Sequence, residues 1–301
     1  FHLCREGRST DKYLKLTGTV VAAHGRQYRI ELAAGETLLC VPRGKKSELV
    51  CGDRVIVERT SASQGVVASI EPRQTLLYRS DHCKQKLIAA NVTQVVVVVA
   101  TEPAFSDELI TRCIVAAESQ KIGILIVLNK CDLRERLAPA SAALAPYEKL
   151  GYRVITLCAL SDGAHLRPYL ADQISLLIGQ SGMGKSTLIN ALVPGAGAAT
   201  REISRTLHTG KHTTTYARLY HPDERSALID SPGLTEFGLH HLSAEEIAGA
   251  FRELRPLLGH CRFRDCRHDR EPDCRVLAAV RHGDIDPRRY AAFRSLCAEI
   301  G

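Results

Sequence analysis

The stretch Gly179-Gln180-Ser181-Gly182-Met183-Gly184-Lys185-Ser186 decides the fold of this chain. Two glycines separated by four residues and followed by Lys and Ser form a phosphate loop. The stretch follows the apolar run Ile174–Ile178 and opens a helical segment, as the motif requires. We predict that this loop and Thr187 bind nucleotide phosphates, with Lys185 on the β- and γ-phosphates and Ser186 on Mg²⁺. The alternative is a glycine-rich turn without a ligand.

A second motif, Asn129-Lys130-Cys131-Asp132, directly follows the apolar run Ile122–Leu128. An NKxD element at a strand end reads guanine in phosphate-loop GTPases. The Asp132 carboxylate accepts hydrogen bonds from the base N1–H and exocyclic amine, which adenine cannot offer. The motif therefore predicts GTP rather than ATP as the ligand, and the alternative is a polar loop between a strand and a helix.

A third motif, Asp230-Ser231-Pro232-Gly233, fits DxxG and also ends an apolar run. Asp230 is expected to hold Mg²⁺ through a water molecule, and the Gly233 N–H is expected to contact the γ-phosphate. The DxxG pattern alone arises often by chance, so it is informative only together with the phosphate loop and the NKxD motif.

Two weaker elements complete the set. Gly210-Lys211-His212-Thr213-Thr214-Thr215 offers a hydroxyl as a further Mg²⁺ ligand, the switch I role, with Thr214 preferred over Thr213. A threonine-rich turn is the alternative. Cys158-Ala159 resembles the S-A element whose backbone contacts the base, with Cys in place of Ser.

The order of these motifs is the decisive feature. GTPases usually run from the phosphate loop through switch I and DxxG to NKxD and S-A, whereas here NKxD and S-A come first. We therefore predict a circularly permuted GTPase domain. Permutation preserves the spatial site and moves the chain ends, so the segment after DxxG leads directly into the C-terminal region.

The surrounding sequence predicts an α/β domain preceded by a small barrel. Apolar runs alternate with helical stretches after Glu71, as expected for parallel strands covered on both faces. Before that point, five short strand patterns suggest an OB-type β-barrel: Leu16–Ala22, Arg26–Leu32, Thr37–Val41, Asp53–Glu58 and Gly65–Ile70. Arg43, Lys45 and Lys46 place three cations in one loop, which is either an RNA contact or a solvated turn.

The C-terminal region contains a metal-binding pattern. Cys261, Cys266, His268 and Cys274 lie within fourteen residues and form a complete tetrahedral Zn²⁺ set. Because protein side chains fill all four positions, the metal is expected to be structural. The alternative is a set of buried thiols, which the neighbouring arginines and aspartates disfavour.

Composition limits the class of protein. The 301 residues, 45% hydrophobic and 24% charged, suit two or three globular domains, and no apolar run approaches the ~20 residues of a membrane span. Eleven cysteines in a chain of this size indicate free thiols, and a net charge of +7 favours an anionic partner. The chain begins at Phe1 without an apolar leader, so we expect a few preceding residues and a cytoplasmic, monomeric protein.

With a barrel, a permuted GTPase pattern and a Cys3His set in this order, the chain resembles the bacterial ribosome small subunit-dependent GTPase family. The resemblance covers nearly the whole chain and rests on GQSGMGKST, GKHTTT, DSPG and the four zinc-ligand residues. It implies a barrel over 1–71, a permuted GTPase domain over 72–254 and a zinc-binding helical module over 255–301. GTP/GDP, Mg²⁺ and one structural Zn²⁺ are the implied cofactors.

The resemblance also implies an activity. Members act in late maturation of the 30S subunit, so the implied partners are that particle and its rRNA, with hydrolysis stimulated by 30S and coupled to release. Leu234 stands where many GTPases have a catalytic glutamine and cannot orient water, so intrinsic hydrolysis is expected to be slow. The histidine proposed in the family to replace that glutamine maps onto His212.

Two rival functions remain at this stage. One is an RNA-binding module that senses GTP with negligible turnover, which Leu234 favours. The other is a phosphate-loop ATPase or small-molecule kinase, which the Asn129–Asp132 element disfavours.

Overall fold

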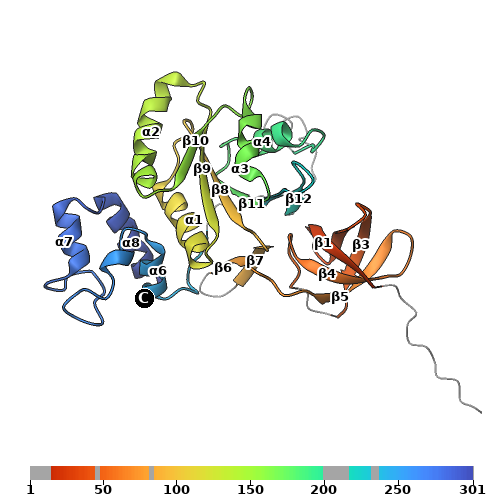
Figure 1. The fold of residues 1–301 in the computed structure, drawn as a ribbon, viewed down its shortest axis with the longest axis horizontal. Helices are drawn as coiled ribbons and strands as arrows, with labels where there is room; N and C mark the ends of the chain where they lie inside the picture. The colour runs from red at the N-terminus through yellow and green to blue at the C-terminus, as the bar shows by residue number, and fades with distance from the viewer. Residues whose placement is uncertain (1–14, 45–47, 81–84, 199–216, 232–236, 301) are drawn as a thin grey trace, which may run out of the picture.

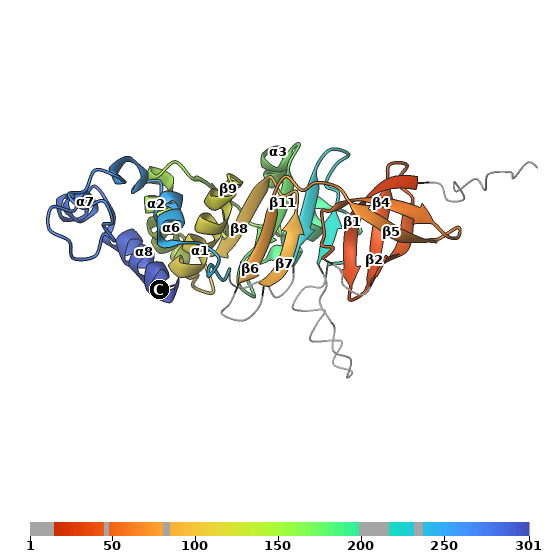
Figure 2. The same cartoon turned by 90° about the horizontal axis from the view of Figure 1, so that it is seen from below.

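A computed structural model describes residues 15–44, 48–80, 85–198, 217–231 and 237–300 of the chain. Three parts lie in a row, with the α/β domain in the middle, the barrel at one end and the C-terminal helices at the other (Figures 1 and 2). One sheet of eleven strands runs through the barrel and the α/β domain, from the strand Arg153–Thr156 at one edge to the strand Arg54–Arg59 at the other. His212, Thr213, Thr214, Gly233, Leu234, Lys45 and Lys46 lie outside the described residues.

The N-terminal strands form the expected five-stranded barrel. They are β1 Lys15–His24, β2 Gln27–Leu32, β3 Thr37–Pro42, β4 Arg54–Arg59 and β5 Gln64–Ile70. Pairing of β1 with both β2 and β4 closes the barrel. Inward and outward residues alternate along the strands, so that Val20, Ile30, Leu38 and Val57 meet in a core of their own.

The central strands are buried on both faces. The parallel strands are β8 Gln94–Ala100, β9 Gly123–Asn129, β10 Arg153–Thr156, β11 Ile174–Ile178 and β13 Ala227–Asp230, with antiparallel β12 Arg218–Tyr220 beside β13. Val95, Val97 and Val99 face one hydrophobic cluster, and Val96 and Val98 face the other. This two-sided burial explains the continuous apolar runs in the sequence.

Helices cover the two faces of this sheet. Helices α1 Asp107–Ser119 and α2 Arg134–Lys149 pack in one hydrophobic cluster, and η1 Gly163–Leu166, α3 Arg167–Leu170 and α4 Lys185–Leu192 pack in the other. The strand β8, helix α1 and strand β9 form a βαβ unit, in agreement with the alternation of apolar runs and helical stretches in the sequence. Because the strands are parallel, their carboxyl ends lie along the same edge of the sheet. Ligands of such sheets bind at that edge.

The C-terminal helices are α6 Ala244–Ala250, η2 Arg255–Leu257, α7 Arg275–His282 and α8 Pro287–Ile300. Of these, α6 and α8 pack against α1. Phe251, Val276, Phe293 and Leu296 are buried in the same cluster as the inner face of α1. In the ranges that the structure describes, no helix is long and apolar enough to cross a membrane.

A hairpin of β6 Leu76–Ser80 and β7 Gln85–Ala90, which the sequence patterns did not indicate, follows the barrel. The barrel also contacts the α/β domain directly, because β1 pairs with β12 through Ala22 and Arg218. The barrel thiol of Cys51 also donates to the carbonyl of Ala217 at 3.3 Å. The barrel is therefore attached to the strand that begins at the end of the 199–216 segment.

Candidate functional site

The phosphate-loop sequence lies at the carboxyl end of β11 and leads into α4. Its first and last motif glycines are required by close packing. A Cβ at Gly179 would lie 2.2 Å from the Val98 carbonyl oxygen, and one at Gly184 would lie 2.2 Å from Asn129 Nδ2. Gly184 also has a φ of 94°, in the left-handed region. The loop backbone is thus fixed against two neighbouring strands before any ligand binds.

Two partly buried groups of opposite charge face the loop. The Lys185 ammonium donates to the carbonyl oxygens of Gly179 at 2.5 Å and Gln180 at 3.0 Å. Burial lowers the pKa of Lys185, and nearby Asp230 partly opposes that shift. Burial likewise raises the pKa of Asp230, with Lys185 opposing.

Among the described residues, the buried Asp230 Oδ1 and Gln180 Oε1 have no hydrogen-bond partner. A buried acceptor without a partner is costly, so such atoms mark places where a ligand belongs. An ammonium and a carboxylate that are both desolvated fit a Mg²⁺ ion and nucleotide phosphates, which would compensate both charges.

Asn129 joins three loops. Its Nδ2 donates to the Met183 carbonyl at 2.8 Å, and its Oδ1 accepts from the backbone N–H groups of Lys130 and Ala159, each at 2.8 Å. The side chain is 2% exposed. The NKxD, phosphate-loop and S-A elements therefore meet at one buried amide, as their shared role requires.

The remaining residues of the NKxD element lie at the edge of the candidate nucleotide site. Lys130 has a φ of 63°, and its ammonium donates to the Glu102 carbonyl at 2.7 Å. Thr101 Oγ1 donates to the Lys130 carbonyl at 2.8 Å. Asp132 is exposed, where its carboxylate is accessible to a base.

The S-A loop is held by a residue that sequence reasoning missed. Asp162 Oδ1 accepts from the Cys158 N–H at 2.6 Å, while the Ala159 N–H is taken by Asn129. Both amides are thus engaged in shaping the loop. An Asp after a strand end signals a turn, but its partner amide cannot be read from the sequence.

The four predicted zinc residues lie together. Their donor atoms are all within 4.8 Å of one another. Cys261 Sγ lies 3.8 Å from Cys274 Sγ, and His268 Nδ1 lies 3.5 Å and 3.4 Å from these sulfurs. Zn–S bonds of about 2.3 Å in a tetrahedron place the sulfurs about 3.8 Å apart, so this donor set fits Zn²⁺.

A carboxylate organises the loop between the zinc residues. Glu271 accepts hydrogen bonds from the backbone N–H groups of Arg267, Asp269 and Arg270 at 2.8 to 3.0 Å. Although burial alone raises the pKa of Glu271, hydrogen bonds from its own backbone N–H and from these three N–H groups lower it to about 2. Tyr290 of α8 donates to the His268 carbonyl at 2.8 Å and ties the loop to the last helix. The loop is therefore held by bonds additional to the metal ligands.

Comparison with known proteins identifies the family. Residues 70–240 match the family model described as RsgA GTPase. The chain belongs to the RsgA GTPase family. A Nitrosospira multiformis protein named small ribosomal subunit biogenesis GTPase RsgA is 51% identical over 294 residues, which cover 98% of this chain and 94% of the relative. A Burkholderia pseudomallei protein of the same name is 53% identical over 287 residues, covering 94% and 91%.

Solved structures agree with this RsgA assignment. The crystal structure of YjeQ from Thermotoga maritima is 30% identical, covers 95% of this chain and 99% of its own, and gives a TM-score of 0.74. The structure of YloQ, a circularly permuted GTPase, is 24% identical with a TM-score of 0.70 and supports the fold. The predicted permutation and GTPase class are thereby confirmed for this RsgA-family chain.

Proposed function

We propose that this RsgA-family GTPase acts in biogenesis of the small ribosomal subunit, that the 30S particle stimulates its GTP hydrolysis, and that hydrolysis is coupled to release. The contact set of Asn129 carries the nucleotide assignment, because one buried amide joins the phosphate-binding loop to both base-reading loops. The names of the Nitrosospira and Burkholderia relatives support the ribosomal context.

Base recognition is assigned to the rim of this site. Asp132 accepts from the guanine N1–H and exocyclic amine, while Lys130, Cys158 and Ala159 shape the surrounding walls. The exposure of Asp132 beside loops held by internal hydrogen bonds supports this assignment. A carboxylate facing adenine would remain unpaired, which favours guanine.

Hydrolysis is assigned to the phosphate end of the site. Lys185 compensates charge on the β- and γ-phosphates, and the Gly233 N–H binds the γ-phosphate. Ser186, Thr214 and Asp230 hold Mg²⁺, which when bound stabilises negative charge on the transferring phosphoryl oxygens. The partnerless Oδ1 of Asp230 supports its part in this set. His212 orients the attacking water in place of the residue at position 234.

We assign the barrel and the zinc-binding module, which flank the GTPase domain, to docking on the 30S particle. This docking takes place in the cytoplasm. The barrel, over residues 1–71, contacts rRNA phosphates through the loop containing Arg43, whose side chain is 62% exposed although it pairs with Glu58. The module over residues 255–301 binds one structural Zn²⁺ through Cys261, Cys266, His268 and Cys274, and the GTPase domain spans 72–254 between them. The free protein is a monomer.

The test of stimulation is GTP turnover by the full chain with purified 30S, 50S and 70S particles. We expect selective stimulation by 30S. Negligible turnover with every particle, while GTP still binds, would instead favour the GTP-sensing RNA-binding module, and equal but substantial rates would contradict selective stimulation by 30S. Competition between GTP and ATP decides against the ATPase and kinase classes if only GTP displaces bound GDP.

The test of release is co-sedimentation with 30S across a protein titration. We expect a non-hydrolysable GTP analogue to retain the protein at least about tenfold more tightly than GDP does, which corresponds to about 1.4 kcal/mol of coupling. Retention should also weaken at higher salt. Equal retention with the two nucleotides would contradict coupling between hydrolysis and release.

A further inference from the structure

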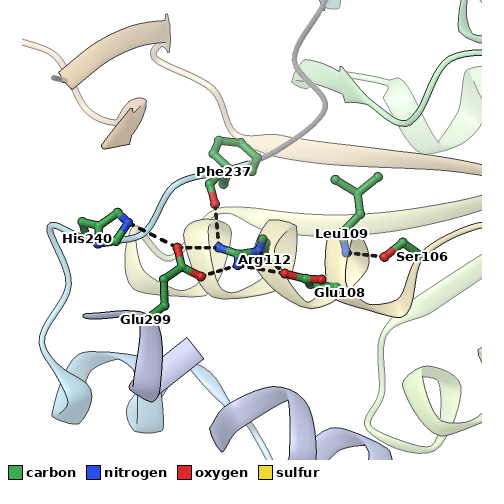
Figure 3. A network of polar contacts seen from close by, with 7 residues as sticks. All are labelled: Ser106, Glu108, Leu109, Arg112, Phe237, His240 and Glu299. Carbon is green, nitrogen blue, oxygen red and sulfur yellow. Dashed lines mark hydrogen bonds and ion pairs between the residues drawn. The ribbon is translucent and has the colours of Figure 1, made fainter. Parts of the chain in front are cut away.

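Arg112 of α1 joins three parts of the molecule (Figure 3). Its Nη1 atom donates to the Phe237 carbonyl at 3.4 Å and to Glu299 Oε1 at 3.1 Å. Its Nη2 atom pairs with Glu299 and with Glu108, one turn back in the same helix. The Arg112 side chain is only 11% exposed and Glu299 is 28% exposed, so this pair is partly shielded from water, whereas Glu108 is 62% exposed.

The first two partners come from functionally distinct segments. Phe237 is fully buried and lies four residues beyond Gly233 in the chain, whereas Glu299 belongs to the last helix, α8. Glu299 Oε1 also lies 3.3 Å from His240 Nε2. The stretch after DxxG is thus bound at two points to an ion pair between α1 and α8.

We propose that Arg112 is a positioning residue for GTP hydrolysis, which fixes the far end of the DxxG segment through the Phe237 carbonyl while Glu299 holds its guanidinium in place. The described residues on either side of positions 232–236 are held, Asp230 by strand pairing of β13 and Phe237 by Arg112. Release of Phe237 should therefore disturb the Gly233 N–H, and small displacements of a catalytic donor are costly.

The geometry favours arginine over a simple cation. A planar guanidinium can donate to a carboxylate and a carbonyl at the same time from fixed directions, whereas an ammonium is a point charge on a flexible stem. Arg112 uses its Nη1 atom on both Phe237 and Glu299. Lysine at position 112 should therefore keep the charge and lose part of the positioning.

A purely structural role would make Arg112 one more bond between α1 and α8. The structure offers a control, because half-exposed Arg288 of α8 pairs with Asp107 of α1 at 3.4 Å, and its ion pairs with described residues are those to Asp107 and Asp286. Buried Arg289 also bonds Thr111 of α1 at 3.0 Å. Helix α8 therefore keeps other attachments to α1 when Arg112 is removed.

The proposal rests on the role proposed for Gly233, and its test uses the full chain without ribosomal particles. Single-turnover and steady-state GTP hydrolysis are measured for Arg112→Ala, Arg112→Lys, Glu299→Gln, the control Arg288→Ala, and Gly233→Pro, which removes the backbone N–H at that position. We expect Arg112→Ala to lower kcat by about fivefold or more, with KM and the GDP Kd within about twofold of the parent. The kcat values of Arg112→Lys and Glu299→Gln should lie between those of Arg112→Ala and the parent. The kcat of Arg288→Ala should match that of the parent.

A kcat for Arg112→Ala within about twofold of the parent would overturn the proposal, as would an equal loss in Arg288→Ala. If Arg112→Ala does not fold, Arg112→Lys and Glu299→Gln decide by the same split between kcat and KM. Loss of activity in Gly233→Pro without loss in the Arg112 variants rejects the positioning role alone. Full activity in Gly233→Pro, which lacks the backbone N–H, instead rejects the assignment of Gly233.

Discussion

Replacement of Asn129 by alanine tests whether one amide holds the nucleotide site together. The substitution removes the partner of three backbone groups, the Met183 carbonyl and the N–H groups of Lys130 and Ala159. The bonds to Met183 and Ala159 are buried, and each buried group left without a partner costs about 1–3 kcal/mol. We expect the free energy of unfolding to fall by about 3 kcal/mol, a large part of the usual total.

The same change should weaken both nucleotides. Because Asn129 sets the spacing between the phosphate loop and the base-reading loops, its loss should raise the Kd of GDP and of GTP by about tenfold or more, or about 1.4 kcal/mol. Asn129→Asp keeps the acceptor Oδ1 but turns an oxygen toward the Met183 carbonyl, so it should be nearly as damaging. Exposed Asp132→Asn is the control that should leave stability unchanged.

The assays are urea unfolding of the nucleotide-free chain and titration with a fluorescent GDP analogue. An Asn129→Ala protein that loses less than about 1 kcal/mol and binds GDP within about twofold of the parent would refute the reasoning. Loss of stability with intact nucleotide affinity would show that the amide serves the fold alone.

Four further predictions concern separate parts of the chain. Asp132→Asn should reduce the preference for GDP over xanthosine diphosphate in competition binding, because an amide cannot accept from both base donors. Lys185→Ala and Ser186→Ala should each reduce 30S-stimulated phosphate release by more than about tenfold, by removing phosphate charge compensation or a Mg²⁺ ligand. Metal analysis of reduced protein should find one Zn²⁺ per chain, and Cys266→Ser should lower that content and unfold the last module by circular dichroism. Glu118→Gln should cost about 1–2 kcal/mol at pH 7 and less near pH 4 in urea unfolding.

The sign of the last prediction follows from the contacts of Glu118. Burial alone raises the pKa of this carboxyl, but hydrogen bonds from Arg255 and Arg252 outweigh burial and hold the pKa below its ordinary value. A lowered pKa in the folded state gives stability that is present above the unfolded pKa and is lost as the pH falls through the folded one. A cost of Glu118→Gln that stays constant with pH would contradict this origin.

Local motifs made much of the site predictable. The phosphate loop, NKxD, DxxG and Cys3His patterns each fix their chemistry within a few residues, and the structure brings the described members together. Helix α1 and the barrel strands were predictable because Ser106, the apolar period and the turn residues act within one turn or strand. Such features need no knowledge of the rest of the chain.

Other features depend on contacts that no local pattern encodes. Helix α2 contains Pro139 and Pro146, which disfavour helix, yet burial of Leu144 and Tyr147 against the sheet outweighs that preference. The Arg112–Glu299 pair joins residues 187 positions apart. The three bonds of Asn129 likewise become visible only when three loops are placed together.

The fold places a flanking part directly after each segment expected to contact Mg²⁺ or the γ-phosphate. Ala217, the residue after 199–216, accepts a hydrogen bond from Cys51 of the barrel and precedes β12, which pairs with β1. Phe237, the residue after 232–236, is bound by Arg112 and, through it, by α8. A particle that held the barrel and the C-terminal helices would therefore hold the residues that follow both segments at once. Circular permutation makes this arrangement possible, because it moves the chain ends away from NKxD and joins DxxG directly to the last helices.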